Sequence, residues 1–530
     1  MARTKEDTIK NITTEYLRDI DIDNYPDPEQ IKGDLLERIH DSFELENSCK
    51  DKNNKWKIPQ ELDGSVIAQI ILRLYHVRRL MWSGAKVGIN YDLVVYQTEG
   101  ENEGLYISDK TELRKIIRLY NNKMQTKATE DVIDRLCENA PICKLEDDPD
   151  LIAVNNGIFN YRTKELLPFD PKYIFNTKSQ VNYVENAQKV IIHNECDNTD
   201  WDVDSWMNEL SDDAEVIELL WQVLGAIVRP HVPWDKMVCL YNEKGNNGKG
   251  TLCQLMRNLC GAENCASISL EAFSQEFMLE ELTHSLAVIT DENQTKVFIK
   301  NTSLLKAVIT GDFLKINRKF EKAISSRFRG LIVQCINDFP KFGDKTDSFY
   351  RRMLIIPFVK CFTGQERKYI KQDYLNRPEV LEYVLCKVLN SDYDEFINPK
   401  VCESMLDIYK GFNDPIRTFL DEVLPQCQWD LVPFSFLYDL YKAWMDKNCP
   451  QGQKQSKQTF IKDVRNMVDD YAEWRAPENS IEPRNKMNKP EPMIYEYGLA
   501  NWQNPHYRGY DIAQICTPYL KSSYKGLQRI

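Results

Sequence analysis

The sequence lacks the paired cysteine spacing that marks zinc ribbons and thiol–disulfide exchange sites. It contains 15 cysteines, yet no two of them form a CxxC motif. Closely spaced ligand pairs are what a structural zinc ion usually requires. We therefore expect reduced, mostly buried thiols, as in proteins of a reducing compartment. No structural metal site is predicted from these cysteines.

Long apolar runs are missing as well. No stretch of about 18 apolar residues occurs, and the beginning, MARTKEDTIKNITTEY, has no apolar segment of the secretory type. From these two absences we expect neither a transmembrane helix nor export. The predicted location is the cytoplasm.

An excess of positive charge is the third absence. Lysine and arginine number 68 against 81 aspartates and glutamates, which gives a net charge of −13. Such a balance argues against a protein that coats nucleic acid over its whole surface. It does not exclude a DNA-binding protein whose basic groups are confined to one channel, because the local distribution of charge decides binding.

The chain is too long for one compact core, with 530 residues. From about residue 205, short apolar strands alternate with amphipathic helices, which predicts an α/β fold with a parallel sheet flanked by helices. Before that point, the segments DLVVYQTEGENEGLYISD and LIAVNNGIFNYRTKELLPF read as β-hairpins. The expected domains are a helical region, an α+β module, the α/β core and a C-terminal domain, at residues 1–75, 76–200, 205–405 and 412–530.

The strongest local signal is a glycine- and asparagine-rich loop between an apolar strand, MVCLY, and an apolar helix, TLCQLMRNL. In this setting small residues let backbone N–H groups approach phosphates, and the start of the helix favours negative charge. Lys249 would supply a positive charge at the β- and γ-phosphates of ATP. The predicted ATP-binding residues are Gly245, Asn246, Asn247, Gly248, Lys249, Gly250 and Thr251.

This loop departs from the GxxxxGK[ST] pattern at two positions. Glu243 takes the place of the first glycine, and Gly250 takes the place of the usual serine or threonine. Thr251, one residue later, remains a candidate ligand of Mg²⁺. The alternative is a turn with a solvated lysine, because short motifs also occur by chance.

Two further apolar strands end in polar side chains. LAVIT leads into Asp291 and Glu292, 42 residues after Lys249 (291 − 249), and LIVQCI leads into Asn337. Ligands bind at the carboxyl edge of a parallel sheet. There one acid can hold Mg²⁺ through water, the other can polarise the attacking water, and the amide can detect the γ-phosphate. The alternatives are a charged turn after LAVIT and an Asx-turn at Asn337.

A basic segment lies between the acids and Asn337. Its cations outnumber the nearby acids Asp312 and Glu321, which predicts contact with a phosphate backbone, and Phe320 offers a face for a base or sugar. The alternative is a solvated charged surface. The cations are Lys315, Arg318, Lys319, Lys322, Arg327 and Arg329.

Arg351 and Arg352 precede the apolar strand MLIIPF. An arginine at such a place can reach the γ-phosphate bound by a neighbouring subunit and stabilise charge in the transition state. The alternative is an ion pair with Asp344 or Asp347.

Taken in order, these motifs resemble the superfamily 3 helicases of the AAA+ class, and most of all the helicase halves of phage and plasmid primase–helicases and of the poxvirus helicase–primase. The stretch 155–171 resembles the module that precedes the ATPase in that family, and 415–475 resembles its C-terminal winged-helix region. Residues 1–75 match nothing familiar. The motifs that carry the resemblance are GNNGKGT, LAVITDEN, LKAVITGDFLKINRKF, LIVQCIND and YRRMLIIPF.

The resemblance implies a ring, usually hexameric, that moves 3′ to 5′ along single-stranded DNA with ATP and Mg²⁺ during replication of a phage or mobile element in a bacterial cytoplasm. Lys249 would bind phosphate, Thr251 and Asp291 would hold Mg²⁺, Glu292 would be the general base and Asn337 the sensor. Arg351 or Arg352 would act in the neighbouring subunit. A hairpin with Lys319 near its tip would grip DNA, helped by Lys315, Arg318 and Phe320.

Two other functions remain open from the sequence. An origin-binding initiator or loader that uses ATP only to assemble would share the basic hairpin, and a small-molecule kinase would share the phosphate loop. The acidic triplets Asp19/Asp21/Asp23 and Asp200/Asp202/Asp204 have no apolar strand or distal histidine beside them. Any primase is therefore expected to be a separate chain.

Overall fold

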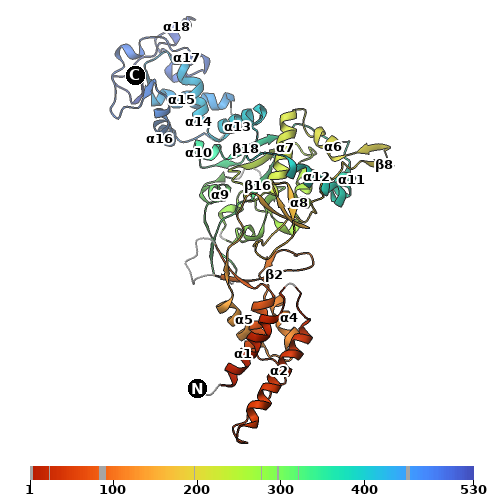
Figure 1. Cartoon of the computed structure of the whole chain (residues 1–530). Helices are drawn as coiled ribbons and strands as arrows, with labels where there is room; N and C mark the ends of the chain where they lie inside the picture. The colour runs from red at the N-terminus through yellow and green to blue at the C-terminus, as the bar shows by residue number, and fades with distance from the viewer. Residues whose placement is uncertain are drawn as a thin grey trace. The chain divides into compact units, whose positions relative to one another are not determined.

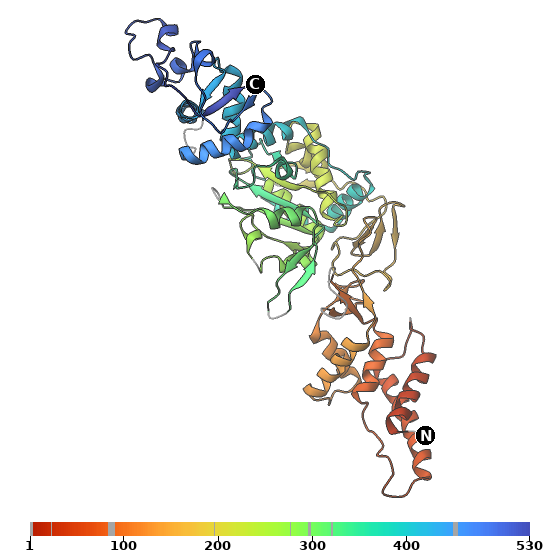
Figure 2. The same cartoon turned by 90° about the vertical axis from the view of Figure 1, so that its left-hand side faces the viewer.

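The computed structural model describes residues 4–22, 24–82, 91–195, 197–275, 277–294, 298–319, 322–448 and 454–530. It divides into two compact units, Met1–Glu403 and Ser404–Ile530 (Figures 1 and 2). The sequence places a domain boundary between residues 405 and 412, near this division. Within the described residues, no helix is long and apolar enough to cross a membrane.

The first unit begins with a helical cluster and a small mixed sheet. Aspartates cap three of its helices, and Thr4 forms a capping box with Asp7. The sheet has the order β3-β2-β1-β4. The elements are α1 Lys5–Asp19, α2 Pro28–Ser48, α3 Gly64–Leu74, β1 Arg78–Met81, β2 Tyr91–Tyr96, β3 Tyr106–Ile107, α4 Lys110–Tyr120, α5 Thr126–Asn139 and β4 Ile142–Cys143.

One core joins all five helices. On α2, Ile31, Leu35, Ile39 and Phe43 recur every four residues and are at most 1% exposed, the spacing of a buried helix face. They share a hydrophobic cluster with residues as distant as Ala140. The boundary expected near residue 75 therefore does not separate two cores, because α4 and α5 complete the packing of α1 to α3.

Next come small antiparallel sheets, β5 Leu151–Val154, β6 Gly157–Asn160 and β7 Glu165–Leu167, and then β8 Ile192–Asn194 with β9 Thr199–Trp201. Both hairpins expected from the sequence form, the earlier one as β2 with β3. Gly157, the first residue of β6, allows β7 to approach closely, since a Cβ there would lie 2.5 Å from the carbonyl oxygen of Leu167.

The remainder of the first unit is built on a five-stranded parallel sheet of order β11-β12-β16-β10-β18. The structure thus confirms the predicted parallel sheet, which lies within a mixed α/β fold. Figure 1 shows α7, α8 and α12 grouped on one side of β16 and β18. The strands are β10 Met237–Tyr241, β11 Cys265–Ala266, β12 Ala287–Thr290, β16 Leu331–Ile336 and β18 Met353–Pro357.

Apolar runs in the sheet strands explain their burial, since a sheet covered on both faces has no solvent side. All six residues of β16 are buried. The strands outside this sheet are β13 Phe298–Ile299, β14 Leu314–Ile316, β15 Ile324–Ser326 and β17 Lys341–Phe342. The helices are α6 Val203–Glu209, α7 Ala214–Ile227, α8 Lys249–Cys260, α9 Ser303–Ile309, α10 Asp347–Tyr350, α11 Lys368–Gln372, α12 Pro378–Asn390 and, across the division, α13 Lys400–Asn413.

The second unit packs helices against an antiparallel sheet of order β19-β21-β20. Its core is rich in aromatic rings, with Phe419, Tyr441 and Phe460 within 6.1 Å of one another between ring centroids. The elements are α14 Pro415–Val423, β19 Leu431–Pro433, α15 Phe434–Asn448, α16 Lys457–Met467, β20 Trp474–Arg475, α17 Met493–Glu496, α18 Ile512–Ile515 and β21 Gly526–Arg529.

The start of β16 depends on a close backbone approach. A Cβ on Gly330 would lie 2.0 Å from the carbonyl oxygen of Leu286. The backbone of the neighbouring strand would have to move to accommodate it. We predict that Gly330→Ala lowers the free energy of unfolding of the first unit by about 1–3 kcal/mol, the usual cost of overpacking. Urea unfolding monitored by tryptophan fluorescence measures it.

The matched control is Gly33→Ala, in the exposed middle of α2, where an added Cβ meets nothing within 4 Å. It should raise stability by about 0.5–1 kcal/mol because alanine favours helix. Equal effects from the two changes would contradict the packing argument.

Candidate nucleotide-binding site

The glycine- and asparagine-rich loop connects β10 to α8, the strand and helix that the sequence predicts. Gly248 has φ +88°, and a Cβ there would lie 2.7 Å from Cδ2 of Leu210, so only glycine fits without strain. Asn247 closes the loop: its side chain donates to the carbonyl of Lys244 at 2.6 Å and accepts from the amide of Lys249 at 3.2 Å. These two hydrogen bonds hold the loop backbone close to the start of α8.

Lys249 lies where β10 and β16 end side by side. Its Nζ donates to Oδ1 of Asn337 at 2.7 Å and to the carbonyl of Ile336 at 3.0 Å. A longer bond of 3.3 Å reaches the carbonyl of Asn242. Lys249 is 6% exposed, and burial lowers its pKa from the usual value. The structure thus brings together the phosphate-binding lysine and the sensor asparagine that the sequence predicts.

Thr251 lies in the first turn of α8 and is partly exposed, while Gly250 beside it faces α11. An added Cβ on Gly250 would lie 3.7 Å from Nζ of Lys371. On the other side, Asn246 bonds Thr363 at 3.3 Å and Glu366 at 3.2 Å. The segment after β18 therefore borders the loop. No motif in the sequence of this segment predicts that position.

The two acids after β12 have different surroundings. Asp291 receives two hydrogen bonds from the guanidinium of Arg257 on α8, at 2.8 and 2.9 Å. Arg257 also donates to the carbonyl of Ile289 at 3.1 Å. Glu292 is exposed. Arg257, which the sequence analysis did not mention, thus ties the helix of the phosphate loop to the acidic turn.

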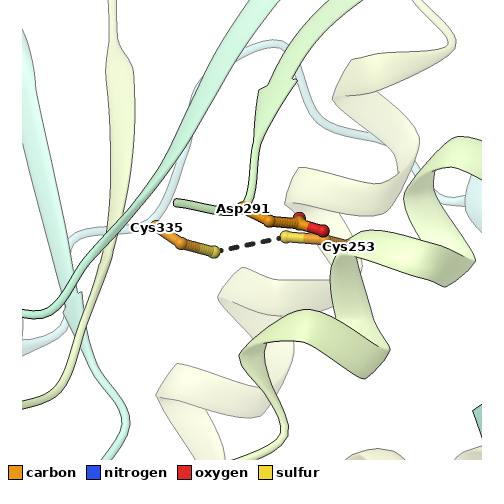
Figure 3. A group of neighbouring side chains, drawn as sticks. All are labelled: Cys253, Asp291 and Cys335. Carbon is orange, nitrogen blue, oxygen red and sulfur yellow. Dashed lines mark hydrogen bonds between the residues drawn. The ribbon is translucent and has the colours of Figure 1, made fainter. Parts of the chain in front are cut away.

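Asp291 also lies beside two buried thiols (Figure 3). Sγ of Cys253 and Sγ of Cys335 are 3.4 Å apart, although the residues are 82 positions apart in the chain. The hydrogen bond to Cys335, together with burial, raises the pKa of Cys253 well above its usual value. A protonated thiol is a poor metal ligand, and the two sulfur atoms already contact each other. The group therefore acts as packing between α8 and β16.

A buried amide network fixes the turn that follows the acids. Nδ2 of Asn293 donates to Oε1 of Gln334 at 2.9 Å and to the carbonyl of Cys335 at 3.0 Å. Gln334 is fully buried and also donates to Oγ1 of Thr290 at 3.3 Å. The signal for this network was the single glutamine inside the apolar run LIVQCI.

The basic segment forms the predicted hairpin. Strands β14 and β15 pair antiparallel, with Ile316 opposite Ile324, and Lys319 lies in the connection between them. Phe320, the predicted stacking residue, lies outside the described residues. The side chains of Lys315, Lys319 and Lys322 are exposed. Arg318, Arg327 and Arg329 instead pair with aspartates earlier in the chain.

The two arginines before β18 also differ. Arg352 donates to Oγ of Ser348 at 2.9 Å, whereas the side chain of Arg351 is exposed. Asp344 pairs with Lys306 at 2.6 Å. Burial alone would raise the pKa of Asp344, but hydrogen bonds from Lys306 and Thr346 hold it at about 2. Among the described residues, neither Arg351 nor Arg352 forms the ion pair with Asp344 or Asp347 that the sequence offered as an alternative.

Three family models match consecutive parts of the chain. Residues 50–212 match D5 N terminal like, residues 240–352 match a family of unknown function (DUF5906), and residues 412–504 match Poxvirus D5 protein-like. The second of these segments contains all the predicted nucleotide-binding residues, from the phosphate loop to the arginine pair.

A similar curated protein is "Putative helicase 121R" of Invertebrate iridescent virus 3, which is 23% identical over 408 residues. The match covers 65% of this chain and 41% of that protein, so the chain spans less than half of its relative's length.

Among solved structures, two apo forms of the NrS-1 C-terminal region are similar. One has 16% identity and a TM-score of 0.45, covering 80% of this chain and 97% of the other. The second has 16% identity and a TM-score of 0.42, covering 77% and 86%. The sequence resemblance to the poxvirus D5 helicase–primase type is confirmed by the family models on both sides of the phosphate-loop segment and by the iridescent virus relative.

Proposed function

We propose that this chain is an ATP-driven DNA helicase of superfamily 3, which forms a ring and moves along single-stranded DNA, 3′ to 5′, in the replication of a phage or mobile element. The observation that carries the proposal is the contact between Lys249 and Asn337. It joins the phosphate-binding and sensor groups of two separate motifs at the carboxyl edge of one parallel sheet, where ligands bind.

The sheet order supports an AAA+ core. The strand of the phosphate loop lies between the strand that ends at Asn337 and the strand that follows the arginine pair. The acidic turn follows the next strand beyond β16. Three of the five motifs, the phosphate loop, the acidic turn and the segment with Asn337, therefore meet at the carboxyl edge, whereas the arginine pair precedes β18 at the opposite edge of the sheet. The helices α14 to α16 and the sheet β19-β21-β20 support the proposed winged-helix domain in the second unit.

The residues present fit ATP and Mg²⁺. Gly248 adopts the left-handed conformation that turns the loop into α8, and Lys249 can exchange its carbonyl partners for phosphate oxygens. In that exchange Asn337 is released from Lys249 and becomes able to bond the γ-phosphate or the attacking water. Thr251 and Asp291 would hold Mg²⁺, and the exposed Glu292 would orient the water.

To hold Mg²⁺, the carboxylate of Asp291 must bind the ion while it still accepts hydrogen bonds from Arg257. A carboxylate has two oxygens and about four acceptor sites, so Arg257 does not exhaust it. Arg257 instead fixes the direction of the carboxylate relative to α8. Hydrolysis in one subunit would be completed by an arginine of its neighbour, which requires a homo-oligomeric ring. A separate primase or initiator protein would complete the replication machinery.

Removing the ammonium of Lys249 tests the proposal most directly. We predict that Lys249→Ala reduces ATP turnover by about 100-fold or more, because a charge aimed at the transferred phosphate is lost. Steady-state phosphate release measures the effect, and circular dichroism checks the fold. Lys244→Ala, an exposed lysine of the same loop, is the matched control. Retained turnover in Lys249→Ala would refute the assignment of the loop.

The hairpin lysine tests the link to DNA. We predict that Lys319→Ala reduces unwinding of a forked duplex by about tenfold and removes most stimulation of ATP turnover by single-stranded DNA, because a phosphate contact near the hairpin tip is lost. Lys10→Ala, an exposed lysine on α1, should change neither. Unwinding at the normal rate would exclude the hairpin from the mechanism. ATP-dependent binding without unwinding in the unmodified protein would favour an initiator.

The exposed position of Arg351 makes it the better candidate for action in a neighbouring subunit. We predict that Arg351→Ala, mixed with active protein, lowers ATP turnover more steeply than simple dilution, because each variant subunit inactivates its neighbour's site. Arg352→Ala is the comparison, since its guanidinium bonds Ser348 within the subunit. If only Arg352→Ala poisons the mixture, the roles are reversed.

A further inference from the structure

The three arginines of the basic hairpin all pair with acids of the module that precedes the parallel sheet. Arg318 makes two bonds to Asp92, at 2.6 and 3.2 Å. Arg327 and Arg329 both reach the same oxygen of Asp147, at 3.0 and 2.9 Å. Arg329 also donates to the backbone carbonyl of Asp147 at 3.1 Å. All of these residues belong to the first unit.

The two acids hold the arginines in different environments. The side chains of Arg318 and Asp92 are 12% and 18% exposed, and Asp92 also accepts a bond of 2.7 Å from the indole of Trp82. Asp147 is 63% exposed. The Asp92 pair is therefore a largely enclosed anchor, while the Asp147 contacts are open to solvent and can be broken without unfolding.

An arginine fork binds carboxylates and phosphates with the same geometry. Two guanidiniums that share one carboxylate leave one positive charge uncompensated at Asp147. Partly exposed ion pairs are weak and screened by salt, so a phosphate chain can compete for them. Arg327, Arg329 and Asp147 also line a cavity of about 120 Å³.

We propose that Asp92 and Asp147 form an acidic clasp that occupies the hairpin arginines in place of DNA phosphates, and that single-stranded DNA must displace at least Asp147 to bind fully. This inference rests on the DNA-binding part of the proposed function. The exposed Lys315 and Lys322 make the first contact with the DNA. When the clasp opens, Arg327 and Arg329 also contact its phosphates. The clasp thus lowers the affinity of the hairpin for short DNA and for DNA bound nonspecifically. It also keeps the hairpin bonded to the preceding module until a DNA strand binds.

The test uses the full chain and a fluorescein-labelled oligothymidylate of about 30 nucleotides, with binding followed by anisotropy over a series of salt concentrations. Asp147→Asn removes the charge at an exposed position and should fold normally. It should raise affinity at low salt about fivefold. The slope of log K against log salt should also steepen, because salt weakens the clasp of the unmodified protein and so partly offsets the loss of phosphate binding there.

Asp148→Asn is the matched control. It removes the same charge one residue away, where Asp148 accepts a hydrogen bond from the amide of Asp150 and bonds no arginine of the described residues. Asp147→Glu keeps the charge and should return affinity and slope towards those of the unmodified protein. If Asp148→Asn raises affinity as much as Asp147→Asn, the effect is general charge and the clasp is refuted. An unchanged slope in Asp147→Asn also refutes it.

The helicase proposal and the clasp proposal can fail separately. Tighter, more salt-sensitive binding by Asp147→Asn in a protein that shows no DNA-stimulated ATP turnover would support the clasp and reject the helicase. If neither the unmodified protein nor the double variant Asp92→Asn/Asp147→Asn binds the oligonucleotide at low salt, the clasp falls together with the DNA-binding role of the hairpin.

Discussion

The ammonium of Lys249, held between the ends of β10 and β16, is the interaction on which the rest of the site depends. Three acceptors converge on it, and two of them, Ile336 and Asn337, belong to a strand far along the sequence. A buried ammonium is costly unless it is bonded, so the two strand ends must stay in register. Any anion that takes over this charge also changes what Asn337 can bond.

Around this centre, α8 is tied to the sheet at two further points. Arg257 bonds the carboxylate of Asp291, and the thiols of Cys253 and Cys335 pack against each other. The phosphate loop, the acidic turn and the sensor strand are therefore linked through one helix. Under the proposed function, a change at the loop would reach the sheet through these rigid elements, which have few alternative packings.

The hairpin adds an electrostatic link of a different kind. Its strands follow from alternation of apolar and polar residues, but its charges are divided by type, with lysines exposed and arginines paired to Asp92 and Asp147. Lysine is the more strongly hydrated cation, and arginine makes the better fork for a carboxylate. An acidic protein can in this way keep a basic hairpin without leaving all of its positive charge exposed.

The sequence by itself determined the elements and the identity of the groups at the strand ends. Periodic apolar runs gave the parallel strands, the hairpins and the helix after the phosphate loop, because burial of one face imposes a local period. It placed Lys249 and Asn337 in separate motifs, and their position at strand ends implied one common edge. Family models of the poxvirus D5 type match the segments on either side of these motifs.

Only the tertiary structure decided the partners. Arg257 with Asp291, Cys253 with Cys335, and Arg318 with Asp92 join residues whose separations of 34, 82 and 226 positions carry no local pattern. The single core of the five N-terminal helices was hidden for the same reason: α4 and α5 follow a sheet in the chain and yet complete the packing of α1 to α3. Side-chain pairing depends on where the folded backbone brings distant segments, and a local sequence pattern contains only the period of its own element.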